Sequence, residues 1–140
     1  MTIRYHEGDL PAGVTFGVSV AIDTETMGLH PHRDRLCVVQ LSRGDGSADV
    51  VRIARGQTRA PRLEALLADP AVVKIFHFAR FDLAALYQRF GVMPAPVYCT
   101  KIASKLARTY TDRHGLKDLL RELLGVEISK QQQSSDWGAD

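Results

Sequence analysis

The spacing of apolar residues changes part-way along the chain. Residues 18–23 (VSVAID) and 35–42 (RLCVVQLS) are short apolar runs rich in β-branched residues, which predicts two buried strands. Residues 49–53 (DVVRI) follow a loop that contains Gly44 and Gly46, the flexible residues that a hairpin turn requires. We therefore expect the chain to open with an antiparallel meander.

After this meander the pattern alternates between helices and strands. Pro61 is well placed at the start of a helix, and Pro70 lies just beyond its end. The expected elements that follow are a strand at 72–76, a helix at 79–90, a short strand at 97–99, a helix from Thr100 to about Tyr110 and an amphipathic helix at 115–124. Such an order predicts an α/β fold with a mixed sheet flanked by helices, and 140 residues fit a single domain spanning 1–140.

Composition narrows the class of protein without identifying it. Apolar residues make up 45% of the sequence and charged residues 24%, which is ordinary for a globular protein. The formal net charge of +2 is too small to argue for nucleic-acid binding by itself. No apolar run is long enough to span a membrane, and the two cysteines, Cys37 and Cys99, form no CxxC pair. We expect a cytoplasmic protein that makes no membrane contact.

Two carboxylates follow the first apolar strand. In Asp23-Thr24-Glu25 the acids are two residues apart, so on a strand they point to the same face. Two like charges held close together are unfavourable unless a cation neutralises them, and carboxylate oxygens suit Mg²⁺ or Mn²⁺. A solvated strand end that happens to be acidic is the alternative, and the triplet alone does not exclude it.

A third acid, Asp82, falls in the first turn of the helix expected at 79–90. An acid is favourable at that position because of the helix dipole, which is one sufficient explanation. Ligands, however, collect at the carboxyl ends of strands in open α/β sheets. If the strands at 18–23 and 72–76 are parallel neighbours, Asp23, Glu25 and Asp82 meet at one rim.

These segments resemble the motifs of a known enzyme family. AIDTETMGL is similar to the first motif of the DEDD exonucleases of the ribonuclease D type, and HFARFD is similar to the second. Residues 124–137 (LGVEISKQQQSSDW) resemble the segment that leads toward the third. The nearest resemblance is to the short bacterial enzymes called nano-RNase C. It implies a ribonuclease H-like exonuclease fold and 3′–5′ hydrolysis assisted by two divalent metals.

The resemblance also implies roles for individual residues. Asp23 would bridge both metals, Glu25 would hold the metal that carries the attacking water, and Asp82 would support the second metal. A pocket for the 3′-terminal nucleotide would lie beside them, with Leu29 against a base. The substrate-binding residues would be Thr24, Met27, Gly28, Leu29, His77 and Phe81. Packing inside the protein is the alternative for both His77 and Phe81.

The third motif of the family, a tyrosine followed four residues later by an aspartate, does not occur in the sequence. Tyr110 lacks an aspartate at that offset, Asp112 is too close to it, and Asp140 has the wrong context. We expect a C-terminally truncated form of a longer enzyme, with a naturally short protein as the alternative.

Three functional hypotheses follow from these motifs. The first is a 3′–5′ exoribonuclease that degrades short oligoribonucleotides such as dinucleotides, with homo-octamer formation implied by the resemblance. The second is a 3′–5′ DNA exonuclease or an RNA-processing enzyme of the ribonuclease D type. The third is a non-catalytic nucleotide-binding or assembly module. Lys101, Lys105 and Arg108 share one helical face, which suits either solvent exposure or phosphate contacts.

Overall fold

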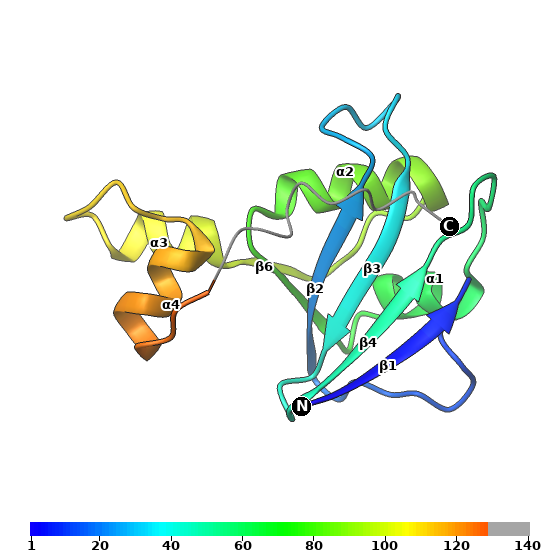
Figure 1. Ribbon diagram of the computed structural model, residues 1–140, viewed down its shortest axis with the longest axis horizontal. Coiled ribbons are helices and arrows are strands. Elements are labelled where there is room, and N and C mark those ends of the chain that lie inside the picture. The colour runs from blue at the N-terminus through cyan, green and yellow to red at the C-terminus, as the bar shows by residue number, and fades with distance from the viewer. Residues whose placement is uncertain (129–140) are drawn as a thin grey trace.

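A computed structural model describes residues 1–128 of the protein. A six-stranded sheet with the strand order β1-β4-β3-β2-β5-β6 forms its centre (Figure 1). The strands are β1 (Thr2–Glu7), β2 (Ser19–Thr26), β3 (Leu36–Ser42), β4 (Ser47–Arg52), β5 (Val73–Phe76) and β6 (Val97–Cys99). The helices are α1 (Pro61–Ala68), α2 (Ala79–Phe90), α3 (Thr100–Ala107) and α4 (Leu116–Leu124).

The sheet is mixed, as the sequence predicts. Strands β2, β3 and β4 pair antiparallel in sequence order, which confirms the hairpin across Gly44 and Gly46. Strand β5 then pairs parallel with β2, and β6 pairs parallel with β5. The carboxyl ends of β2, β5 and β6 therefore lie along one edge of the sheet.

The expectation that the chain opens with the meander is wrong. Strand β1 comes first and pairs parallel with β4 at the edge of the sheet. Its side chains are exposed or only partly buried, so its sequence, TIRYHE, carries no run of apolar residues to mark it as a strand. Residues 2–7 are a strand because they pair with β4, and not because of an apolar pattern in their sequence.

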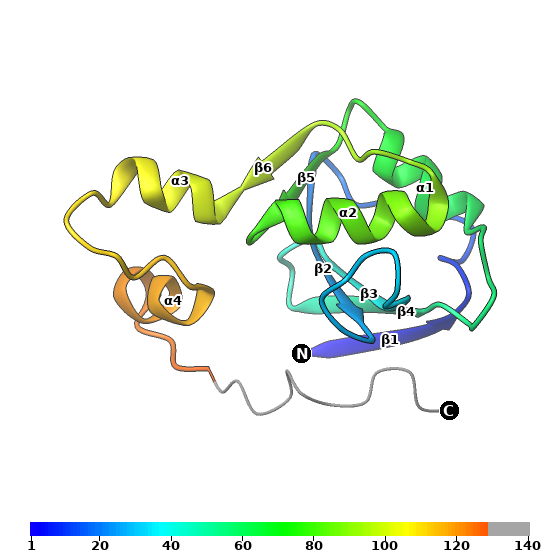
Figure 2. The same ribbon diagram turned by 90° about the horizontal axis from the view of Figure 1, so that it is seen from above.

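Helices α1 and α2 cover the same face of the sheet (Figure 2). Helix α1 begins at Pro61 and buries Leu63 and Leu67, while α2 buries Ala85 and Leu86. Alternate residues of β2 and β3 meet them, which produces a core that contains Phe16, Val20, Ile22, Val39, Leu41, Val51, Phe76 and Phe90. The other strand face is covered by no helix within residues 1–128 (Figure 2).

Helices α3 and α4 form an arm beyond the β6 edge of the sheet (Figures 1 and 2). Helix α3 ends at Ala107, before the predicted Tyr110. Thr100 does not cap it: Cys99 occupies the N-cap position, and the Thr100 hydroxyl donates to the Phe76 carbonyl at 3.1 Å. The expected amphipathic helix is α4, although within residues 1–128 only its Leu119 is buried.

The arm is organised around Arg108, which is 8% exposed. Its guanidinium donates to the Ser104 hydroxyl at 2.8 Å and to the Arg113 carbonyl at 2.7 Å, and it also pairs with Glu122. His114 bonds to the Ser104 hydroxyl at 2.7 Å. Polar contacts between α3, the following loop and α4 thus take the place of an apolar core.

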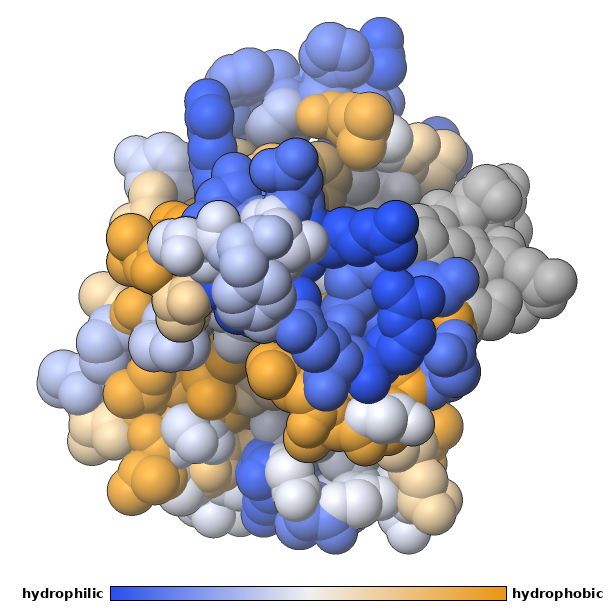
Figure 3. Space-filling model, turned by 90° about the vertical axis from the view of Figure 1, so that its left-hand side faces the viewer, coloured by the Kyte–Doolittle hydropathy of each residue, from blue (hydrophilic) through white to orange (hydrophobic). Residues whose placement is uncertain are grey.

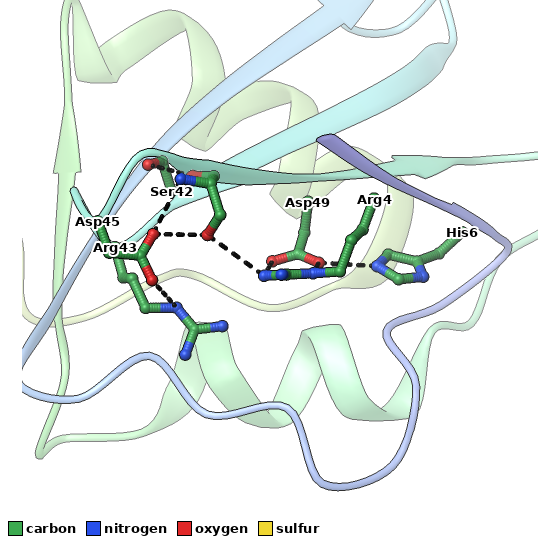
Figure 4. A network of polar contacts seen from close by, with 7 residues as sticks. Arg4, His6, Ser42, Arg43, Asp45 and Asp49 are labelled. Carbon is green, nitrogen blue, oxygen red and sulfur yellow. Dashed lines mark hydrogen bonds and ion pairs between the residues drawn. The ribbon is translucent and has the colours of Figure 1, made fainter. Parts of the chain in front are cut away.

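A buried carboxylate holds the edge strand β1 in place (Figure 4). Asp49 of β4 is 1% exposed and accepts two hydrogen bonds from the Arg4 guanidinium, at 2.9 and 3.1 Å. His6 contacts the same carboxylate at 2.8 Å. Arg4 and His6 keep the pKa of Asp49 below its usual range. The ionised side chain therefore joins two residues of β1 to its neighbour.

Replacement of Asp49 by alanine should detach β1 from the sheet. We expect Asp49→Ala to lower the free energy of unfolding by about 2 kcal/mol, because several charge-assisted hydrogen bonds are lost. Amide hydrogens of residues 2–7 should exchange faster in the same variant. Glu7→Ala is the matched control, since it removes only exposed contacts with Arg52 and Tyr5 and should change the stability little. Equal effects of the two substitutions would contradict the role given to Asp49.

Candidate active site

The three predicted acids come from neighbouring elements at the carboxyl ends of parallel strands. Asp23 and Glu25 belong to β2, where they point to the face opposite the buried Ile22 and Thr24. Asp82 lies in the first turn of α2, which begins just after β5. Because β2 and β5 pair in parallel, with Ala21 opposite Ile75, the acids gather at one rim as the sequence predicts.

Asp82 is fixed by Thr24. Its carboxylate is 3% exposed and accepts hydrogen bonds from the Thr24 amide at 3.2 Å and from the Thr24 hydroxyl at 2.5 Å. Thr24 is itself 5% exposed. The structure therefore places Thr24 behind the acids, where it orients one of them, and its predicted contact with a nucleotide stays a prediction.

The electrostatic environment disfavours ionisation of all three acids. Burial raises the pKa of Glu25 to about 7, and the Asp23 carboxylate adds to the shift. Burial also raises the pKa of Asp82 to about 7, although the hydrogen bonds from Thr24 act in the opposite direction. Solvent reaches the Asp23 side chain, yet partial enclosure raises its pKa as well. Within residues 1–128, no cationic side chain forms an ion pair with these three acids.

These acids fit a divalent cation by their chemistry. Their oxygen donors are hard ligands, and burial raises the pKa of each without an ion pair inside residues 1–128 to oppose it. Within the part of the protein that the structure describes, however, no group of three or more His, Cys, Asp or Glu side chains is close enough to hold a metal ion. The three acids lie near one another, but their oxygens do not form a complete metal-coordination site within residues 1–128.

A loop beside the acids carries three more predicted residues. Met27 and Leu29 are large apolar side chains that are 48% and 79% exposed. Between them, Gly28 lies so close to Asp34 that a Cβ atom would approach its carboxylate to 2.4 Å. Asp34 in turn accepts a hydrogen bond from the His30 amide at 3.0 Å. Any larger residue here would displace the Asp34 carboxylate, and the loop presents Leu29 to solvent.

The two remaining predicted residues are partly buried. His77 follows β5, and its Nδ1 lies 2.9 Å from the Thr100 hydroxyl. Phe81 is in the first turn of α2, next to Asp82, and is neither fully exposed nor part of the buried core. Residues 129–137 of the segment that resembles the approach to a third motif, together with Asp140, lie outside the described residues.

Two further residues lie at this rim: Phe78, which sequence reasoning missed, and Lys101, for which it left solvent exposure and phosphate contact open. Phe78 has a left-handed backbone with a φ of 64°, and the Lys101 ammonium lies 4.2 Å from its ring centroid. Nothing in the local sequence signals a positive φ at a phenylalanine, because glycine and asparagine are the usual residues there.

A family model described as 3′–5′ exonuclease matches residues 10–140. The protein is 39% identical to ribonuclease D of Acidiphilium cryptum over 86% of its own length and 30% of that protein's. It thus spans about 30% of the length of the ribonuclease D relatives that it matches.

Solved structures give a closer match. Brucella melitensis NrnC with bound Mg²⁺ is 63% identical, with a TM-score of 0.95 over 100% of this protein and 68% of that one. The same nuclease bound to pGG is 64% identical, with a TM-score of 0.96 over the same shares of the two proteins. Escherichia coli RNase D is 28% identical over 88% of this protein and 32% of that one, with a TM-score of 0.75. The predicted ribonuclease H-like exonuclease fold is therefore confirmed.

The raised pKa values predict an unusual pH dependence of stability for the metal-free protein. Glu25 and Asp82 hold their protons to about pH 7 when folded, whereas they release them near pH 4 when unfolded. Their contribution is therefore fully present in acid and is lost as the pH rises to about 7. Denaturant titrations in a chelator should show lower stability at about pH 8 than at about pH 5.

A divalent cation should reverse this loss, because it binds the ionised acids of the folded state only. The double variant Glu25→Gln with Asp82→Asn should show a flatter pH profile and a weaker response to Mg²⁺. A wild-type profile that rises steadily from about pH 5 to about pH 8 would contradict the assignment.

Proposed function

The chain belongs to the 3′–5′ exonuclease family, and from that premise we propose that it is a cytoplasmic exoribonuclease that shortens oligoribonucleotides from the 3′ end. The products would be 5′-mononucleotides. The observation that carries this proposal is the rim of three carboxylates from β2 and α2, which have raised pKa values and no cationic partner among residues 1–128. Very short RNA is the favoured substrate because the protein is 64% identical to a nuclease whose structure contains pGG.

We assign the metal ligands to Asp23, Glu25 and Asp82. Mg²⁺ is the first candidate, because Brucella melitensis NrnC has been solved with this ion bound, and Mn²⁺ shares its preference for oxygen ligands. When bound, such ions activate water for attack on phosphorus and stabilise the leaving oxygen. Residues 1–128 contain no complete set of metal ligands. We therefore propose that a further carboxylate ligand comes from the sequence that follows residue 128.

The remaining residues of the rim would bind and orient the RNA. Leu29 and Met27 are exposed apolar side chains on the loop next to Glu25, which suits contact with the 3′-terminal base. Gly28 lets that loop close onto Asp34. Thr24 holds the Asp82 carboxylate from behind, so we assign it a positioning role. His77 bonds to Thr100 beside the rim, and we keep it as a residue that contacts a phosphate or sugar.

Neutralisation of Asp23 should abolish most of the hydrolytic activity and leave the fold intact. We expect Asp23→Asn to reduce hydrolysis of a 5′-phosphorylated diribonucleotide by at least about a hundred-fold, because a metal ligand and a negative charge are lost. Its stability without metal should be unchanged or higher, since burial already disfavours the ionised acid. Hydrolysis is measured by chromatography of released mononucleotides, with thermal unfolding as the control for folding.

Asp112→Asn is the matched control for this prediction, since it removes an exposed acid from the arm. It should hydrolyse the dinucleotide at the wild-type rate. The corresponding deoxydinucleotide tests the alternative of a DNA exonuclease, and a longer structured RNA tests the processing alternative. Wild-type binding of Mg²⁺ without hydrolysis of any of these substrates would support the non-catalytic module instead.

We further propose that copies of the protein associate through the α3–α4 arm, as the octamers implied by the resemblance require. The arm exposes Ile102, Leu106, Tyr110, Leu123 and Leu124, each by more than half of its surface. An apolar groove of about 760 Å³ lies next to it, lined by residues of α2, β6 and α3. Figure 3 faces this end of the molecule and shows hydrophobic patches beside a strongly hydrophilic cluster.

A charge placed on the exposed side of α4 should weaken this association. Sedimentation velocity should show that the wild-type protein is larger than a monomer, and that Leu123→Glu shifts it toward the monomer because a charge would be buried in an apolar contact. Lys117→Glu is the control on the same helix and should leave the mass unchanged. A monomeric wild-type protein would refute association through the arm.

A further inference from the structure

The strand register aligns a second group of residues with the acids. Ala21 of β2 lies opposite Ile75 of β5, so two residues further on, His77 lies at the level of Asp23. Phe76 lies opposite Cys99 of β6, so the next level pairs His77 with Thr100. The bond of 2.9 Å between those two side chains shows that this alignment continues beyond the strands.

One residue further along, the same alignment places Phe78 beside Lys101. The Lys101 ammonium lies 4.2 Å from the centroid of the Phe78 ring, within the range of a cation–π contact. Both residues therefore stand at the carboxyl ends of β5 and β6, on the rim that carries the three acids. They lie on the side of the rim away from β3, because β5 and β6 follow β2 in the sheet order.

The backbone of Phe78 is strained. Its φ of 64° and ψ of 57° are left-handed, and within residues 1–128 it is the one residue other than glycine with a positive φ. A bulky side chain is unfavourable in that conformation. The ring is also 46% exposed, so burial in the core offsets little of this strain. Strained residues of this kind cluster where a protein holds a side chain ready for a ligand.

We propose that Phe78 and Lys101 form a subsite of the exonuclease site for the nucleotide next to the scissile phosphate. The Phe78 ring stacks on a nucleobase, and Lys101 leaves the ring to contact the adjoining phosphate. This inference rests on the proposed exoribonuclease function, which it extends by two residues. An exposed aromatic ring beside a cation is the combination that binds single-stranded nucleic acid with little preference among bases.

The subsite can be tested by binding of pGG, measured calorimetrically with Ca²⁺ in place of Mg²⁺ so that the dinucleotide stays intact. Phe78→Gly should weaken binding about ten-fold, which is typical of the loss of one stacking contact. Phe78→Tyr keeps the ring and should restore binding. Phe78→Gly should not lower the melting temperature, because glycine adopts the φ of 64° without strain.

The role given to Lys101 predicts how the affinity for pGG depends on salt concentration. Lys101→Ala should weaken binding, and the slope of log affinity against log salt should fall by about 0.7, the value for one phosphate contact with a single strand. Lys105→Ala is the matched control, because Lys105 lies one turn further along α3 and is exposed. It should leave both the affinity and the slope unchanged.

The subsite is refuted if Phe78→Gly binds pGG as tightly as the wild type, if Lys101→Ala behaves like Lys105→Ala, or if the wild-type protein does not bind pGG. Hydrolysis of the same dinucleotide in Mg²⁺ tests the proposed function separately. Binding that depends on Phe78 without any hydrolysis would retain the subsite and remove the catalytic proposal. Hydrolysis with an unchanged kcat/KM in Phe78→Gly would retain the catalytic proposal and remove the subsite.

Discussion

The parallel pairing of β5 with β2 is the constraint on which the rest of the site depends. It brings α2, and with it Asp82, to the end of the strand that carries Asp23 and Glu25. A buried lysine supports the next pair in the sheet, β5 with β6. Lys74 of β5 is 0% exposed, and its ammonium donates to the carbonyls of Asp69 and Ala95, at 2.5 and 2.9 Å. Those carbonyls lie in the segments that enter β5 and β6, so one side chain ties together the amino ends of two neighbouring strands.

The rim itself opposes folding. Burial disfavours the ionised forms of Asp23, Glu25 and Asp82, and Phe78 has a backbone conformation that a phenylalanine rarely adopts. Such local conflicts persist only where the surrounding structure enforces them. Here the sheet register and the hydrogen bonds from Thr24 to Asp82 supply that enforcement. The buried acids and the strained Phe78 lie on the same rim, as expected of a site in which a bound ligand offsets their unfavourable energies.

Much of this arrangement can be predicted from the sequence, because it depends on local periodicity. The alternation of β2 places Asp23 and Glu25 on one face, and the start of α2 places Asp82 in a first turn. Edge strand β1 is missed because it has no buried apolar face. The bonds from Thr24 to Asp82 and the backbone conformation of Phe78 are missed for a different reason. A threonine between two acids gives no sign that it bonds to a residue 58 positions later, and a positive φ is set by the path from β5 into α2.

The α3–α4 arm shows why an amphipathic pattern alone does not fix which face is buried. The leucines of α4 share one stripe, yet the buried centre of the arm is Arg108 with Ser104, while Leu123 and Leu124 are 63% and 69% exposed. Directional bonds to Arg108 join α3, the following loop and α4. The apolar stripe is consequently available to another surface. Because α3 begins directly after β6 and carries Lys101 in its first turn, the arm is joined to the rim of the site through a rigid element and a side-chain contact.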